Sequence, residues 1–144
     1  MRLEFGYGAG VQTVELPEEN LLGVLTANEI RHELGGEAAV RHALAHPIGA
    51  KPLRESIAPG QKIAIIASDI SRPVPSYEIL PAILDELTAA GCRDEDVTVV
   101  FALGSHRHHT EAEKRRLAGD AVFERVRCED SDPDDCTHLG TTSA

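Results

Sequence analysis

The stretch from Ile63 to Thr110 decides the fold, because it holds two apolar runs that are each followed at once by a polar cluster. The first run is rich in β-branched residues and does not alternate, which is typical of a strand buried on both faces of a parallel sheet. Between the runs, apolar residues three and four apart predict a helix over 77–90. The stretch therefore predicts a strand–helix–strand unit with both polar clusters at one end of the sheet, where ligands bind in such folds. The runs and clusters are, in order, IAIIA (63–67), SDISRPVP (68–75), VTVVFAL (97–103) and GSHRHHT (104–110).

The rest of the chain alternates between short strand and helix patterns. Together with the central stretch, this predicts the α/β class, a Rossmann-like, mostly parallel sheet flanked by helices, with an N-terminal β-hairpin. The length favours a single domain over residues 1–144. The other expected elements are hairpin strands over 3–7 and 11–16, a strand or buried connection over 21–25, helices over 37–45, 52–57 and 110–118, a helix or strand over 121–127, and an acidic loop over 128–135.

Composition excludes several classes of function. The formal net charge of −10 argues against nucleic acid and anionic membrane as partners, because both need basic patches. The three cysteines form no C-x-x-C pair, which predicts free thiols in a reducing compartment. The first residues contain no apolar signal segment, and no apolar run is long enough to span a membrane. We expect a cytoplasmic protein.

The first polar cluster contains a candidate anion-binding arginine. Asp69 and Arg72 follow the buried strand, and Pro73 and Pro75 stiffen the backbone behind them. A guanidinium held in one direction can bind a carboxylate or phosphate through two parallel hydrogen bonds. Asp69 could orient this arginine or accept a hydrogen bond from a ligand hydroxyl. The alternative is a surface turn in which Asp69 caps backbone amides and pairs with Arg72.

The second cluster contains three histidines within four residues. Imidazole is suited to proton transfer near neutral pH, and it is also a common metal ligand. His106 lies nearest the strand end and is the best single candidate for catalysis. Arg107 would add positive charge to the cleft, and His109, just before the next helix, is the residue expected to be structural. Neighbouring side chains point in different directions, so the three histidines do not easily share one site.

These two clusters resemble the N-terminal domain of the nickel-dependent lactate racemase family. Such proteins are two-domain enzymes that interconvert the stereoisomers of 2-hydroxy acids in a cleft between the domains. The resemblance implies a nickel-pincer nucleotide cofactor tethered to a lysine. The residues that carry it are 68–75 with Ile79-Leu80-Pro81, and 102–107 with 110–113, and softer matches extend it to nearly the whole chain.

The resemblance also implies roles for particular residues. Arg72 would hold the substrate carboxylate, and His106 would be one of two histidines that take the hydroxyl proton. Asp69 and Arg107 would support the same substrate pocket, and Ser71 would contact the cofactor. No metal ligand is assigned within this chain.

The chain departs from the family in two ways. The family's second catalytic histidine, tethering lysine and nickel-binding histidine lie further along than residue 144, and Cys128-Glu129-Asp130 stands where the family usually has Asn-His-Asp. We therefore expect an N-terminal half that is inactive by itself and that partners a missing C-terminal domain. Apolar surface left exposed at that docking site would allow homo-oligomerisation.

Two other interpretations remain open. His106, His108 and His109 could serve a metal-dependent hydrolase, although the later ligands of such sites are missing. Alternatively, Arg72 and Arg107 could make a non-catalytic module that binds small anions.

Overall fold

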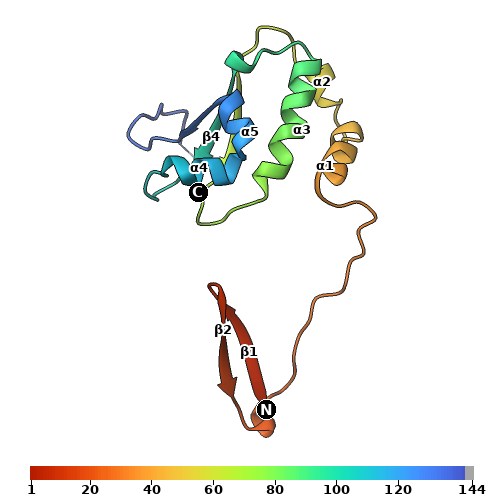
Figure 1. Ribbon diagram of the computed structural model, residues 1–144, viewed down its shortest axis with the longest axis vertical. Coiled ribbons are helices and arrows are strands. Elements are labelled where there is room, and N and C mark those ends of the chain that lie inside the picture. Colours follow the sequence, from red (N-terminus) through yellow and green to blue (C-terminus); the bar gives the residue numbers. More distant parts are fainter. Residues whose placement is uncertain (142–144) are drawn as a thin grey trace. The chain divides into compact units, whose positions relative to one another are not determined.

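The computed structural model describes residues 1–141 and divides into two compact units, Met1–His32 and a second unit that begins at Glu33 (Figure 1). In the first unit, strand β1 (Arg2–Tyr7) pairs antiparallel with β2 (Gly10–Glu15). Gly8 adopts a positive φ of 58° at the turn, which glycine allows without strain. The predicted hairpin is confirmed. A short 3-10 turn follows at Glu18–Asn20.

The predicted strand or buried connection over 21–25 is wrong. These residues belong to no helix or strand, and the side chains of Leu22 and Leu25 are fully exposed. A short apolar run becomes a strand only where it finds a pairing partner and a surface to cover. Neither is available to this run within residues 1–141.

The second unit is built on a parallel sheet in the order β3 (Ile63–Ser68), β4 (Val97–Ala102) and β5 (Arg127–Asp130). Ile63 of β3 pairs with Val97 of β4, and Ser68 pairs with Ala102, so these two strands end level with each other. The predicted acidic loop over 128–135 is partly wrong, because its first residues form strand β5. The described elements of this unit are α1 (Gly36–Ala45), α2 (Leu53–Ser56), β3 (Ile63–Ser68), α3 (Ser76–Ala89), a 3-10 turn (Asp94–Asp96), β4 (Val97–Ala102), α4 (Glu111–Ala118), α5 (Asp120–Arg125) and β5 (Arg127–Asp130).

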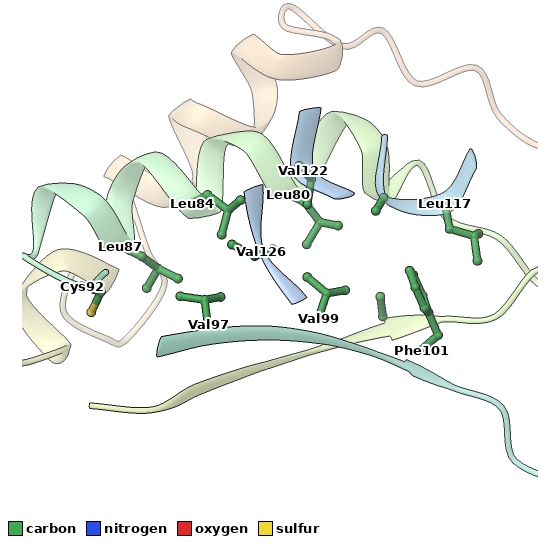
Figure 2. Close-up of a cluster of buried hydrophobic side chains, with 12 residues drawn as sticks. Leu80, Leu84, Leu87, Cys92, Val97, Val99, Phe101, Leu117, Val122 and Val126 are labelled. Atoms are coloured by element: carbon green, nitrogen blue, oxygen red, sulfur yellow. The ribbon is translucent and has the colours of Figure 1, made fainter. Parts of the chain in front are cut away.

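The core lies between α3 and the sheet (Figure 2). Leucines on one face of α3 point toward β4, whose alternate residues point back toward the helix. The helix ends in a Schellman motif: the Gly91 amide donates to the Thr88 carbonyl (2.9 Å) and the Cys92 amide to the Leu87 carbonyl (3.0 Å). Gly91 has a φ of +85°, as this motif requires. The facing core residues are Leu80, Leu84 and Leu87 on α3 and Val97, Val99 and Phe101 on β4.

The expectation that β3 is buried on both faces is wrong. Its side chains alternate, with Ile65 and Ala67 directed into the core and Ala64 and Ile66 exposed. Ile66 is 67% exposed although it is a large apolar residue. Among residues 1–141, no helix has the length and apolar character needed to cross a membrane. We call the side of the sheet turned away from α3 the open face; it consists of Ala64 and Ile66 on β3, Thr98, Val100 and Ala102 on β4, and Arg127 and Glu129 on β5.

Candidate functional site

A hollow of about 480 Å3 lies at the carboxyl ends of β3 and β4. It exists because the two strands end level and each runs into a polar loop. The sequence-based expectation that both loops meet at this edge of the sheet is confirmed. The hollow is lined by Ile66, Ala67, Ser68, Asp69, Ser71, Arg72, Ala102, Leu103, Gly104, Ser105 and His106.

Asp69 and His106 form the centre of this site. Nδ1 of His106 hydrogen-bonds Oδ2 of Asp69 and lies 3.1 Å from Oγ of Ser71. The other carboxylate oxygen, Oδ1, accepts from Oγ (2.7 Å) and the backbone amide (3.2 Å) of Ser71. The hydrogen bond from the Ser71 hydroxyl, and then that from His106, lower the pKa of Asp69 to about 2. Asp69 is therefore an ionised acceptor at neutral pH.

This arrangement selects the tautomer of His106. Because a carboxylate has no proton to give, the neutral imidazole must carry its proton on Nδ1. Nε2 then keeps a free lone pair and can accept a proton. The carboxylate would also stabilise the imidazolium that forms after the transfer, as an aspartate does in other proton-transfer pairs. The sequence offered Arg72 or a ligand hydroxyl as the partner of Asp69, whereas the structure pairs this carboxylate with His106 and Ser71.

Arg72 lines the same hollow and is exposed. Its backbone amide donates to the Asp69 carbonyl (3.3 Å), which closes a tight turn between them. Its guanidinium forms no ion pair or hydrogen bond with another described residue. The alternative of an Asp69–Arg72 surface pair is therefore not what the structure contains. An unpaired guanidinium beside a proton acceptor suits a ligand that carries both a carboxylate and a hydroxyl.

Arg107 does not join this group. It pairs through two hydrogen bonds with Glu113, at 2.9 Å from Nη1 to Oε2 and 2.8 Å from Nη2 to Oε1. The hydrogen bond from Arg107, followed by that from the Thr110 amide, lowers the pKa of Glu113 to about 2. Glu113 also completes the predicted capping box with Thr110 at the start of α4, which is confirmed. Arg107 is thus neutralised outside the hollow.

The three histidines diverge. His108 is exposed, with Nδ1 3.5 Å from Oδ2 of Asp130. His109 is buried, and its two ring nitrogens contact Asp130 and the backbone amide of Ile70. In the part of the chain that the structure describes, no three His, Cys, Asp or Glu side chains are arranged to hold a metal ion. The partnership of His109 with Asp130 is a contact that sequence reasoning missed, because the segment of Asp130 was expected to be a loop.

Together, these features define an α/β domain with a carboxylate-oriented histidine and, within residues 1–141, an arginine that has no side-chain partner, both at the carboxyl ends of its parallel strands. The model of the lactate racemase N-terminal domain family matches residues 7–144. The chain belongs to this family, and the resemblance noted in its two loops is confirmed.

Individual relatives agree with this assignment. The chain is 36% identical over 125 residues to a lactate racemase of Thermoanaerobacterium thermosaccharolyticum, which covers 85% of the chain and 29% of that protein. It is 32% identical over 122 residues to a lactate racemase of Lactiplantibacillus plantarum, covering 83% and 28%. The solved lactate racemase apoprotein from T. thermosaccharolyticum superposes with a TM-score of 0.69 at 34% identity, covering 92% of this chain and 30% of that chain. The chain therefore spans less than a third of the length of these relatives.

Proposed function

We propose that this chain supplies the N-terminal part of the catalytic cleft of a 2-hydroxy-acid racemase, an isomerase resembling lactate racemase. The observation that carries the proposal is the presence of Arg72 and the Asp69–His106 pair in one hollow. A cation for the carboxylate and a base for the neighbouring hydroxyl are the two groups that a 2-hydroxy acid requires. The two curated relatives, both lactate racemases, support the choice of reaction.

Each residue has a defined task in this proposal. Arg72 binds the substrate carboxylate through two hydrogen bonds and so sets the position of the α-carbon. Nε2 of His106 takes the hydroxyl proton, and Asp69 balances the charge that appears on the imidazole. Arg107 is not included, because it is paired with Glu113 and does not line the hollow.

The nickel-pincer nucleotide implied by the resemblance would supply a hydride acceptor for the α-carbon. Among residues 1–141, no three His, Cys, Asp or Glu side chains are arranged to hold a metal ion, and we assign no residue of this chain to the nickel. The resemblance also implies that Ser71 contacts the cofactor. Its hydroxyl already bonds Asp69 and His106, which leaves one lone pair for such a contact.

The partner in this proposal is polypeptide corresponding to the remaining length of the relatives. Parallel sheets in α/β proteins are covered on both faces, whereas among residues 1–141 the open face leaves Ile66 and Ala102 exposed. Covering it is the task we assign to that polypeptide. A second copy of the chain would be the alternative occupant, and sedimentation of the purified chain would reveal it. We place the protein in the cytoplasm, which suits its free cysteines at 92, 128 and 136.

Binding tests the substrate site without requiring turnover. The isotopically labelled chain is titrated with L-lactate while the amide signals of residues 68–72 and the guanidinium signal of Arg72 are followed. We expect these signals to shift in the wild type and in Arg107→Gln, which is the matched control. In Arg72→Gln, which lacks the guanidinium signal, the amide signals of residues 68–72 should stay fixed. Equal binding by both variants, or no binding by the wild type, would contradict the assignment of Arg72.

Activity tests the reaction. A chimaera in which this chain replaces the matching segment of the T. thermosaccharolyticum lactate racemase is loaded with cofactor and assayed for racemisation of L-lactate. We expect turnover that His106→Gln lowers about 10²- to 10⁴-fold, the usual contribution of a general acid–base. A chimaera that binds lactate at Arg72 but does not racemise it would favour the non-catalytic anion-binding module.

A further inference from the structure

His109 lies outside the hollow, yet it contacts the loop that carries Asp69. Its side chain is only 1% exposed, and both ring nitrogens have partners. Nδ1 lies 2.7 Å from Oδ1 of Asp130, and Nε2 lies 3.0 Å from the backbone nitrogen of Ile70, the residue directly after Asp69. A buried histidine with two specific partners on two other segments is a structural link between them.

The direction of each hydrogen bond follows from the chemistry. Burial opposes ionisation of Asp130, but hydrogen bonds from the His109 side chain and amide, together with the charge of Lys114, outweigh it and lower its pKa. Asp130 is thus an acceptor, so the neutral ring of His109 carries its proton on Nδ1. Nε2 is then the acceptor that the Ile70 amide needs. The backbone amide of His109 donates to the second oxygen of Asp130 (2.9 Å) and fixes the ring further.

The side chains of the loop after β3 are tied to His106 through Asp69 and Ser71 and to the core through Ile70, but its backbone has few ties to other segments. Its turn is closed within itself, by the Ser71 amide on Asp69 Oδ1 and by the Arg72 amide on the Asp69 carbonyl. Among the described backbone groups of residues 69–72, the Ile70 amide is the donor that bonds outside the loop. Phe101 packs edge-on against the ring of His109, with centroids 5.6 Å apart and planes at 81°, so the acceptor is held by the core.

We propose that His109 is a positioning residue of the site, anchored by Asp130, that holds the Ile70 amide and thereby aims the Asp69 carboxylate at His106. The importance of this positioning role for catalysis rests on the proposed function. The hydrogen bonds of His109 do not depend on that function. The role requires one rigid side chain that donates toward Asp130 and accepts from Ile70. Glutamine can do both, with its amide nitrogen and oxygen, whereas leucine of similar volume can do neither.

The experiment uses the complete 144-residue chain, labelled with ¹⁵N, as wild type, His109→Gln, His109→Leu and the exposed neighbour His108→Gln as control. The direct signature is a scalar coupling across the hydrogen bond between the Ile70 nitrogen and Nε2 of His109. The functional signature is the resonance of the His106 Nδ1 proton, which reports its bond to Asp69. The exchange rate of the Ile70 amide reports how often the loop opens.

In the wild type we expect the coupling and a slowly exchanging Ile70 amide. His109→Leu should speed that exchange about tenfold and abolish the His106 Nδ1 proton resonance. His109→Gln should restore both, and His108→Gln should change neither. If His109→Leu does not fold, the wild-type coupling and the rescue by glutamine still decide the matter. Absence of the coupling, or an intact His106 resonance in His109→Leu, would overturn the proposal.

These signals need no substrate. Failure to bind lactate would therefore contradict the proposed function and leave the coupling in place. Loss of the coupling with intact lactate binding would contradict only the role of His109.

Discussion

Replacing Asp69 with asparagine should reverse the tautomer of His106. One carboxylate oxygen, Oδ1, accepts two hydrogen bonds from Ser71, and the other faces Nδ1 of His106. An asparagine has one acceptor and one donor end. Its carbonyl must therefore stay with the two Ser71 donors, which turns its NH2 group toward His106. Nδ1 must then accept, and the proton moves to Nε2.

The size of the effect follows from counting hydrogen bonds. The opposite orientation of the asparagine amide would break the two hydrogen bonds from Ser71. Each bond changes the population ratio of the two orientations by a factor of about 2 to 13. Together they favour the reversed tautomer roughly 5- to 150-fold. With its lone pair on Nε2 replaced by a proton, His106 could no longer accept the substrate proton. In the chimaera, racemisation should fall by roughly 5- to 150-fold, because only the minor tautomer then presents a lone pair on Nε2.

The assay is ¹⁵N spectroscopy of the imidazole nitrogens at a pH where the ring is neutral. The wild type should show a protonated Nδ1, and Asp69→Asn should show a protonated Nε2. Ser71→Ala is the matched control, because it removes one bond to Asp69 and leaves the carboxylate facing His106. A wild type already protonated on Nε2, or an unchanged spectrum in Asp69→Asn, would refute the reasoning.

Three further predictions concern stability and activity. Leu84→Ala should lower the free energy of unfolding by about 3–4 kcal/mol in urea titrations, because this core side chain is 1% exposed. Ile66→Ala on the open face should lower it by less than about 1 kcal/mol, and equal losses would contradict the described core. The chain should lose stability as pH falls from about 4.5 toward 2. In the folded chain, the pKa values of Asp69 and Glu113 are lowered to about 2, so both carboxylates stay ionised over this range. The unfolded chain takes up protons at these groups over the same range, which favours unfolding. Glu113→Gln should flatten that dependence in melts at several pH values, and an identical acid profile would count against the Arg107–Glu113 pair. The chain alone, supplied with cofactor, should not racemise L-lactate by chiral chromatography, and robust turnover would disprove this.

Much of the central unit could be predicted because its signals are local. The helix expected over 77–90 runs from Ser76 to Ala89, and the two strands agree with their expected ranges to within a residue. The capping box at Thr110 needs only two residues three positions apart, and it is present. Elements defined by their own side-chain spacing are therefore the ones that sequence reveals best.

Long-range pairing explains what could not be predicted. β5 contains Glu129 and Asp130 and looks like a loop, but it pairs with β4, and His109 and Lys114 surround the Asp130 carboxylate. The apolar run at β3 likewise cannot reveal whether one or both of its faces are covered.

In the candidate site, too, features set by the topology could be predicted, and individual hydrogen-bond partners could not. The meeting of the two loops follows from the topology of a parallel sheet, so the placement of Asp69 and His106 near each other could be expected. Their hydrogen bond could not, because several partners were chemically possible. The pairing of Arg107 with Glu113 had a signal in the sequence, since the residue that completes a capping box at the start of a helix is a ready partner for a nearby cation.

Ile66 and Ala102 belong both to the open face and to the wall of the hollow. Any polypeptide that packs on that face would therefore exclude water from the floor of the site as well. Two unit charges 4 Å apart attract each other by about 1 kcal/mol in water and by about 4 kcal/mol at an effective dielectric constant of 20. The attraction between Arg72 and a bound anion would therefore become stronger when the open face is covered. Assembly would then act as a chemical switch, because the same contact that completes the hydrophobic layer would turn a weak, wet anion site into a strong one.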